Sequence, residues 1–359
     1  MVSGIGPARL KRLIDHFGDA EKAWRAAPLE LARSGLDRKS LQALLAARDR
    51  LDLDAEMARI SEFGARVVTL ADDSYPRLLR EVSLPPPVLY YKGSLLPADD
   101  YAVAVVGTRH VKTYGREVTR YLAGELARNK ITVVSGLALG IDAAAHQAAL
   151  DAGGRTIAVL GSGLDVIYPG ENTGLARSIV ASGAVVTEYP LGTKPDRGNF
   201  PARNRIISGL SLGTLVTQAG ERSGALITAY HALEQGREVF SVPGSILDGG
   251  CSGTNQLIQR GEAKLVLKAA DILEELNLSM VSATFQERVI VPGDATEREL
   301  LKQLSDEPVH VDEIARAAAL PIAQVTGALT LMELKGMVRQ AGGMSFVLAH
   351  EAGVRYVVD

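Results

Sequence analysis

The sequence predicts an α/β protein built on a doubly wound, mostly parallel sheet, with a helical module before the sheet and a winged helix after it. Through the middle of the chain, short apolar runs alternate with helical stretches of about 10 to 18 residues, the pattern of parallel strands joined by crossover helices. The length of 359 residues, of which 47% are hydrophobic and 23% charged, is enough for two or three folded domains.

Seven apolar runs are the candidate strands. They span residues 67–70, 103–106, 132–134, 156–160, 185–187, 214–217 and 239–242. These seven strands and the length of chain that holds them are too few for an eight-stranded α/β barrel, which needs about 250 residues and eight strand-helix pairs. An open Rossmann-like sheet is therefore favoured. The predicted domains are a helical module at 1–62, an extended Rossmann-like core at 63–276, a linker at 277–294 and a winged helix at 295–359.

The first segment has the pattern of a helix-hairpin-helix. Gly4-Ile5-Gly6-Pro7 precedes an amphipathic helix, and Ser34-Gly35-Leu36 leads into a second one. Backbone N–H groups at such a helix start can hold a phosphate, with help from Lys11 and Arg12, but the segment can equally be a small packing module. Because the chain begins almost directly on a hairpin glycine, we expect the natural N-terminus to lie further upstream.

The last segment predicts three helices and a short hairpin. Thr296-Glu297-Arg298-Glu299 is typical of a capped, acidic helix start, and two apolar stretches flank Gly342-Gly343. A winged helix of this kind usually binds DNA, yet residues 295–350 hold 5 basic and 7 acidic side chains. Neutralising phosphates needs the opposite balance, so a protein contact is favoured for this domain.

Composition excludes several classes of protein. Cys251 is the single cysteine and the six histidines are scattered, so neither a disulfide nor a metal site is expected. No apolar run approaches the roughly 18 residues of a membrane span and no signal segment is visible, so we expect a cytoplasmic protein. There is no Gly-x-Gly-x-x-Gly turn or P-loop in the expected place, and no cofactor is predicted.

The charge is unevenly distributed along the chain. The net charge of −3 divides into +4 for residues 1–50, −4 for 51–100, +4 for 101–270 and −7 for 271–359. A polyanion would therefore meet the helical module and the core, whereas the acidic C-terminal part is suited to another partner.

Glycines and charged residues follow the predicted strands. The carboxyl ends of parallel strands meet at one rim, where ligands of open α/β sheets bind. Backbone N–H groups there can hold phosphates, and an arginine adds a charged fork, although glycines can also simply make tight turns. The candidates after the strands at 103–106, 132–134 and 156–160 are Gly107, Thr108, Arg109, Ser135, Gly136, Gly140, Gly161 and Gly163.

The most concentrated signal is an aromatic ring among arginines. Single-stranded nucleic acid needs a charged groove with a ring on which bases stack. Paired arginines on a helix can instead be structural, and Ser223-Gly224 offers a further helix start for a phosphate. The candidates in this stretch are Arg197, Phe200, Arg203, Asn204 and Arg205.

A catalytic interpretation has less support. Asp142 and His146 stand at i and i+4 and can pair, but no serine or cysteine with an evident base accompanies them. The alternative function is a nucleotide enzyme that releases the base of a nucleoside monophosphate, with Glu188 or Glu221 as its carboxylate. Each is a lone carboxylate beside a strand end, so a nonenzymatic binder is favoured.

Taken in order, these motifs closely resemble the DprA/Smf family, DNA-processing protein A, from about residue 72 to 270. Individually they are modest, but their order is highly specific. The motifs are Gly107-Thr108-Arg109, Tyr114-Gly115, Ser135-Gly136-Leu137-Ala138-Leu139-Gly140-Ile141-Asp142, Gly161-Ser162-Gly163-Leu164-Asp165, Tyr168-Pro169, Phe200-Pro201-Ala202-Arg203-Asn204-Arg205, Ser223-Gly224 and Val242-Pro243-Gly244.

The resemblance implies a Rossmann-like core that binds single-stranded DNA without cleaving it, protects it and loads the RecA recombinase in natural transformation and recombination. It also implies a core-mediated homodimer, a sterile-alpha-motif-like head and a winged-helix tail, in competent bacteria. Arg109, Arg197 and Phe200 match residues implicated in DNA contact. Many members have Tyr-Pro-Lys where this chain has Gly170 after Tyr168-Pro169. We expect either weaker binding or that Lys194, Arg197 or the helical head takes over the missing lysine's role.

Overall fold

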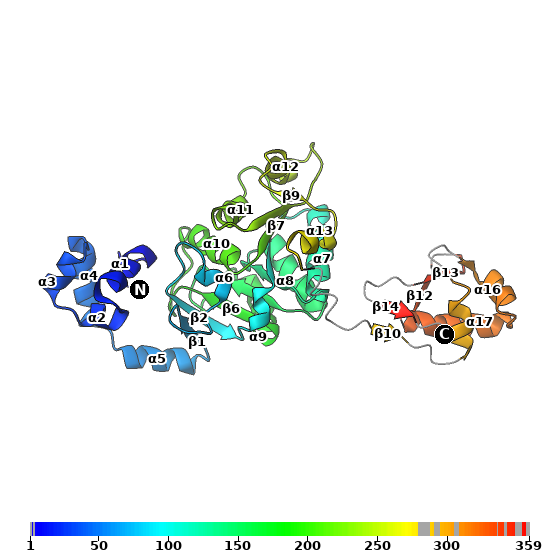
Figure 1. The fold of residues 1–359 in the computed structure, drawn as a ribbon, viewed down its shortest axis with the longest axis horizontal. Coiled ribbons are helices and arrows are strands. Elements are labelled where there is room, and N and C mark those ends of the chain that lie inside the picture. Colours follow the sequence, from blue (N-terminus) through cyan, green and yellow to red (C-terminus); the bar gives the residue numbers. More distant parts are fainter. Residues whose placement is uncertain are drawn as a thin grey trace. The chain divides into compact units, whose positions relative to one another are not determined.

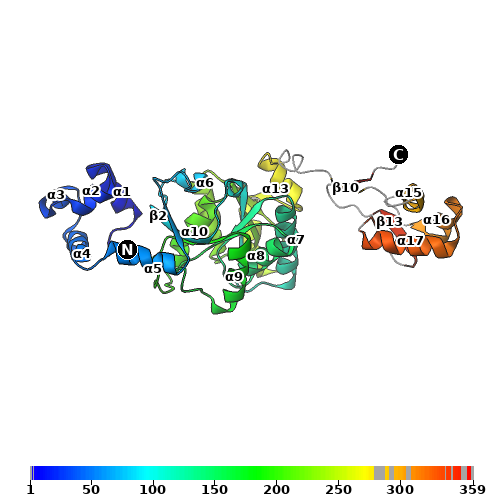
Figure 2. The same ribbon diagram turned by 90° about the horizontal axis from the view of Figure 1, so that it is seen from below.

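The computed structural model divides the chain into two compact units, Met1–Ser279 and Met280–Asp359 (Figures 1 and 2). The residues that it describes are 2, 4–278, 288–290, 295–304, 309–335, 337–340, 343–348 and 354–356. The boundary predicted between a helical module and the core, at residues 62 and 63, lies inside the first unit and stays a prediction.

Five helices open the first unit: α1 (Pro7–Phe17), α2 (Ala20–Arg25), α3 (Pro28–Arg33), α4 (Arg38–Arg48) and α5 (Leu53–Glu62). Aspartate side chains cap three of them, because Asp19, Asp37 and Asp52 accept hydrogen bonds from backbone N–H groups in the first turn of α2, α4 and α5. Arg9 bonds to the carbonyl oxygen of Gly4 and pairs with Asp37 at 2.7 Å. Arg9 thereby ties the first glycine turn to the start of α4.

A nine-stranded sheet follows in the order β1-β2-β6-β5-β4-β3-β7-β8-β9. From β6 to β9 all neighbours are parallel, whereas β1 pairs antiparallel with β2 and β2 antiparallel with β6. The strands are β1 (Arg66–Thr69), β2 (Val88–Gly93), β3 (Ala102–Gly107), β4 (Thr132–Ser135), β5 (Thr156–Val159), β6 (Ala184–Thr187), β7 (Gly213–Gln218), β8 (Glu238–Ser241) and β9 (Lys264–Leu265).

All seven predicted strands are present, and the mostly parallel sheet is confirmed. The run predicted at 67–70 corresponds to β1, an edge strand that pairs antiparallel with β2. Strand β2 itself was not predicted from the sequence. Most of β2 is only half-buried, so its sequence Val-Leu-Tyr-Tyr-Lys-Gly lacks a continuous apolar run. β9 was missed because it has two residues.

The helices cover both faces of the sheet. On one face, α7 (Thr113–Arg128) and α8 (Ile141–Asp151) pack on β3 and β4, and α9 (Thr173–Ser182) packs on β5 and β6. On the other face lie α6 (Arg77–Arg80), α10 (Asn199–Gly209), α11 (Ala225–Glu234) and α12 (Ser252–Gln259), whose apolar side chains share one core with the strands. α13 (Ala269–Glu275) contacts α7. The chain reverses its direction of travel between β3 and β7, so a crevice is expected there.

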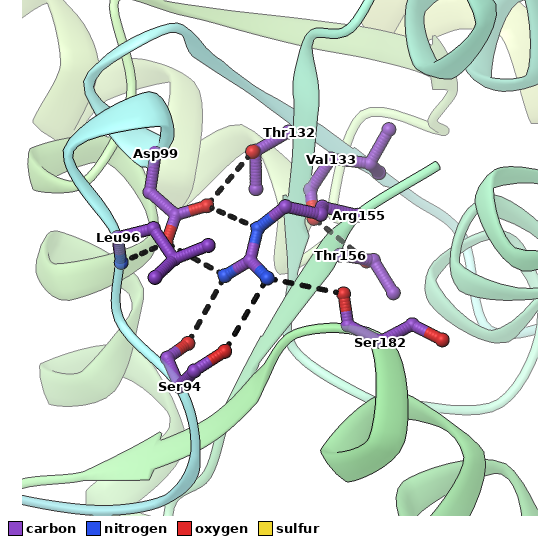
Figure 3. A network of polar contacts seen from close by, with 8 residues as sticks. All are labelled: Ser94, Leu96, Asp99, Thr132, Val133, Arg155, Thr156 and Ser182. Carbon is purple, nitrogen blue, oxygen red and sulfur yellow. Dashed lines mark hydrogen bonds and ion pairs between the residues drawn. The ribbon is translucent and has the colours of Figure 1, made fainter. Parts of the chain in front are cut away.

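A network around Arg155 joins the antiparallel strands to the parallel ones at the amino ends of β4 and β5 (Figure 3). Arg155 donates to both oxygens of Asp99, from Nε at 3.0 Å and from Nη2 at 2.9 Å. Its guanidinium also donates to the carbonyl oxygens of Ser94 and Ser182, and Thr132 donates to Asp99. A bidentate Arg-carboxylate pair of this kind fixes the relative orientation of its two side chains. The pair therefore stabilises the amino ends of the parallel strands, opposite the end where ligands bind.

The second unit is a winged helix, as predicted. Its helices are α15 (Ala295–Leu301), α16 (Val311–Ala317) and α17 (Ile322–Leu334), and its sheet order is β11-β13-β12. The strands are β11 (Val309–His310), β12 (Val338–Gln340) and β13 (Ser345–Leu348), and β12 and β13 form the expected antiparallel pair. Leu300, Val325, Leu329 and Met332 are fully buried between the helices.

At the boundary of this unit the predicted start of the first helix needs correction, and the linker at 277–294 stays a prediction. Thr296 was predicted to cap the first helix, but α15 already begins at Ala295. The predicted linker at 277–294 contains β10 (Arg288–Ile290), which pairs in parallel with β14 (Val354–Tyr356); residues 279–287 and 291–294 lie outside the described residues. Among the helices described, none is by itself long and apolar enough to cross a membrane.

Candidate functional site

A cleft of about 820 Å³ lies at the carboxyl ends of β3 and β7, where the direction of the chain reverses. The turn after β3, the start of α10 and the turn after β7 form its walls. Its polar and aromatic lining residues are Thr108, Arg109, His110, Asp142, Tyr168, Arg197, Phe200, Arg203, Asn204, Arg222, Ser223 and Thr228.

An aromatic platform stands in this cleft. Phe200, in the first turn of α10, lies with its ring centroid 5.6 Å from that of Tyr168, at an interplanar angle of 35°. The exposed Arg109 has its guanidinium carbon 5.6 Å from the centroid of Phe200. A cation over a ring face is held by the ring's quadrupole, so the charge and the ring present one joint surface.

Two glycines make this arrangement possible by allowing close packing. A Cβ at Gly161 would come within 2.9 Å of the Phe200 ring, so only glycine lets the ring lie over the turn after β5. Gly140 has φ +84°, and a Cβ there would lie 2.3 Å from the carbonyl oxygen of Thr108. The start of α8 can therefore approach the turn that carries Arg109.

Arg203 is a buried cation behind the platform. Its side chain is on the inner side of α10, the residue is only 4% exposed, and Nη1 donates to the carbonyl oxygens of Gly136, at 2.7 Å, and of Val159. These carbonyls belong to the ends of β4 and β5, so one guanidinium joins α10 to both strands. Burial lowers the pKa of Arg203 to about 10, although nearby Asp142 opposes the shift.

Asp142 provides negative charge near Arg203. Its Oδ2 accepts hydrogen bonds from the backbone N–H groups of Gly136 at 3.1 Å and Ala138 at 3.3 Å. Burial raises the pKa of Asp142, and Arg203 and these N–H groups act in the opposite direction. His146 does not take up the expected partnership with Asp142, because its Nδ1 bonds to Thr156 Oγ1 at 2.6 Å. Burial lowers the pKa of His146 to about 3.

The carboxylates considered for hydrolysis are engaged outside the cleft lining. Glu188 is 8% exposed and pairs with Arg205 at 2.5 Å, and burial raises its pKa. Arg205 also donates to the carbonyl oxygen of Leu84. Glu221 accepts a hydrogen bond from Gln256. In the described part of the chain there is no group of three or more His, Cys, Asp and Glu side chains that could hold a metal.

The structure brings together nine of the sixteen predicted site residues in the cleft lining. These are Gly107, Thr108, Arg109, Arg197, Phe200, Arg203, Asn204, Ser223 and Gly224. Gly136 lines a small adjoining hollow of about 50 Å³ together with Arg109 and Tyr168. The other predicted residues lie outside this lining: Ser135, Gly140, Gly161, Gly163, Lys194 and Arg205.

Four of the predicted residues make contacts inside the fold. Ser135 is buried and donates to the carbonyl oxygen of Val105. A Cβ at Gly163 would meet the carbonyl oxygen of Pro190 at 2.6 Å, which explains this glycine by close packing. α11 is capped by Gly224, and the Ser223 hydroxyl accepts a hydrogen bond from the N–H of Ala225 at 3.4 Å.

Sequence reasoning missed His110, Tyr168 and Arg222 as cleft residues. Arg222 follows β7 as Arg109 follows β3, so the rule that selects residues after strand ends could have found it. Tyr168 is far from any strand end in the sequence, and only the fold brings it to Phe200.

Comparisons with known proteins identify related chains. The family described as DNA recombination-mediator protein A matches residues 66–277, and the DprA winged helix domain matches 286–344. Protein Smf of Synechocystis sp. is 38% identical over 96% of both chains.

Two solved structures are also similar. One is the X-ray structure of DNA processing protein A from Streptococcus pneumoniae, with a TM-score of 0.69, 39% identity and coverage of 76% of this chain and 94% of that one. The other, described by its single-stranded DNA binding mode, is DNA processing protein A from Helicobacter pylori, with a TM-score of 0.53, 32% identity and coverage of 59% and 96%.

We predict that Arg203→Met destabilises the first unit. The substitution leaves the carbonyl oxygens of Gly136 and Val159 without their donor, and we expect the free energy of unfolding to fall by about 2–4 kcal/mol. Urea denaturation followed by far-UV circular dichroism measures the change. Arg109→Met is the control and should stay within about 0.5 kcal/mol of the wild type, because this arginine is exposed. Equal stability of both variants would contradict a buried role for Arg203.

Proposed function

The chain belongs to the DNA recombination-mediator protein A family, and we propose that its cleft binds single-stranded DNA. The observation that carries the proposal is the pair of rings, Phe200 and Tyr168, with Arg109 lying over Phe200. Rings that face an open cleft accept unstacked bases, which a single strand offers and a duplex does not.

Phosphates would be held by exposed arginines. At the starts of α10 and α11 the N–H groups of Asn199, Ala225, Leu226 and Ile227 already donate hydrogen bonds inside the protein. Arg109, Arg197 and Arg222 are exposed in the cleft lining. They are better suited to phosphate contact than Arg203 and Arg205, whose guanidinium groups already bond inside the protein.

We propose that the protein acts by binding and handing over the strand, not by cleaving it. The family's description as a recombination mediator supports transfer of bound DNA to a recombinase of the RecA type. The carboxylates Glu188 and Glu221, which an enzyme would need, are engaged in other contacts. These contacts of the two carboxylates favour a binding protein that protects and delivers incoming DNA strands during natural transformation, in the cytoplasm.

Two further partners belong to the proposal. β9 ends the sheet, and Leu265 and Leu267 beside this edge are 42% and 71% exposed, which supports a homodimer that covers them. In the winged helix, the exposed positions described on α17 include Ile322, Thr330, Leu331 and Glu333, none of them basic. Such a surface fits a protein partner better than phosphates.

We expect Arg109→Ala to weaken binding of a labelled oligo-dT about tenfold at moderate salt, because a charge-assisted phosphate contact beside the platform is lost. Fluorescence anisotropy measures the affinity, and the matched duplex should bind more weakly than the single strand. Arg177→Ala removes an exposed arginine of α9 outside the cleft and should change little. Unchanged affinity in Arg109→Ala would exclude this cleft as the binding site.

Gly170→Lys is expected to tighten binding several-fold. Gly170 follows the cleft residue Tyr168 by two positions, is exposed, and has no atom within 4 Å of a built Cβ. A lysine there adds one phosphate contact, so the salt dependence of log K should steepen by about 0.7. Gly174→Lys, at an equally open position of α9, is the matched control. If both lysines act alike, the gain reflects net charge and not a contact at the cleft.

A further inference from the structure

Gln218 is a buried polar residue directly behind the cleft. It is the last residue of β7 and is 1% exposed. Its backbone carbonyl oxygen accepts a hydrogen bond from the N–H of Thr108 at 2.8 Å, and its side-chain Oε1 accepts one from the N–H of Lys112 at 3.3 Å. Gln218 therefore holds the backbone on both sides of Arg109.

Close packing restricts where this side chain can go. A Cβ at Gly115 would lie 2.2 Å from Gln218 Oε1, and a Cβ at Gly250 would lie 3.3 Å from Nε2. The Nε2 group also faces Cys251 Sγ at 3.9 Å. The amide thus fills the space between two segments. Its Oε1 lies against the start of α7, and its Nε2 lies against the segment that precedes α12.

Other contacts join the same two segments. Lys112 pairs with Asp248 at 2.7 Å, and the Tyr114 hydroxyl donates to the carbonyl oxygen of Pro243 at 2.7 Å. The Lys112 side chain is 63% exposed, so its ion pair contributes little to stability. The partly buried hydrogen bond from Lys112 N–H to Gln218 is better protected from water than this exposed ion pair.

We propose that Gln218 is a positioning residue for single-stranded DNA binding, acting through Arg109. This rests on the function proposed for the cleft. Arg109 is exposed, so the backbone of the turn must direct its guanidinium to Phe200 before DNA arrives. A turn released from Gln218 samples more conformations, and binding then has to order it again, which lowers affinity without removing any group that touches DNA.

The test is a double-mutant cycle with oligo-dT, measured by anisotropy. Gln218→Met keeps the length of the side chain but removes its acceptor, and we expect about tenfold weaker binding. In the Arg109→Ala background the same substitution should cost less than about twofold, because Arg109 is the group through which it acts. Equal losses in both backgrounds would overturn the proposal.

Thr217→Val is the matched control. Thr217 is the preceding residue of β7, is also 1% exposed, and shares a hydrogen bond with Thr119 Oγ1 at 2.7 Å. It should lose stability without losing affinity, since its hydroxyl does not hold the turn. If Thr217→Val weakens binding as much as Gln218→Met, any damage to β7 suffices, and the specific role of Gln218 is wrong.

Amide hydrogen exchange read by mass spectrometry provides a second measurement that does not need DNA. The peptide containing residues 108–115 should exchange faster in Gln218→Met and as slowly as the wild type in Thr217→Val. Gln218→Glu keeps an oxygen acceptor for Lys112 and should also exchange slowly. Unchanged exchange in Gln218→Met overturns the proposal, whereas faster exchange with no effect of Arg109→Ala on DNA affinity would show that only the proposed DNA site is wrong.

Discussion

The arrangement of the cleft depends on a charge buried at the carboxyl ends of two strands. Arg203 is almost inaccessible to water, and its cost of burial is offset by the carbonyl oxygens of Gly136 and Val159 and by the nearby carboxylate of Asp142. Because Arg203 lies one turn after Phe200 on α10, the same bonds that satisfy its charge also fix where the ring stands. The ring's position is therefore set by the strand ends and not by a ligand.

The opposite side of the cleft is fixed by a neutral group. Gln218 at the end of β7 bonds to the turn after β3, and this turn carries Arg109. Strands β3 and β7 are parallel neighbours, and the connections that follow them lead to α7 and α11 on opposite faces of the sheet, so a crevice opens between these connections. Exposed side chains on rigid supports then need little ordering when a strand binds.

The sequence predicted the sheet well because its parallel strands are buried on both faces and read as continuous apolar runs. It also predicted the rim, since strand ends are visible in the sequence. Burial of individual arginines could not be predicted. Arg203 and Arg205 are two residues apart in one motif, yet one binds two carbonyl oxygens and the other pairs with Glu188, because α10 turns them toward different neighbours. Tyr168 joins the cleft only through the fold.

The most direct test of the central claim is photocrosslinking of an oligonucleotide that carries 5-iodouracil, followed by mass spectrometry of the peptides. Crosslinks form where a base lies against an aromatic ring. If bases stack in the cleft, the crosslinks will map to Phe200 and Tyr168, and Arg109→Ala will reduce their yield. Crosslinks confined to the helical module, for example at Trp24, or to the winged helix would contradict a DNA site at the carboxyl ends of the sheet.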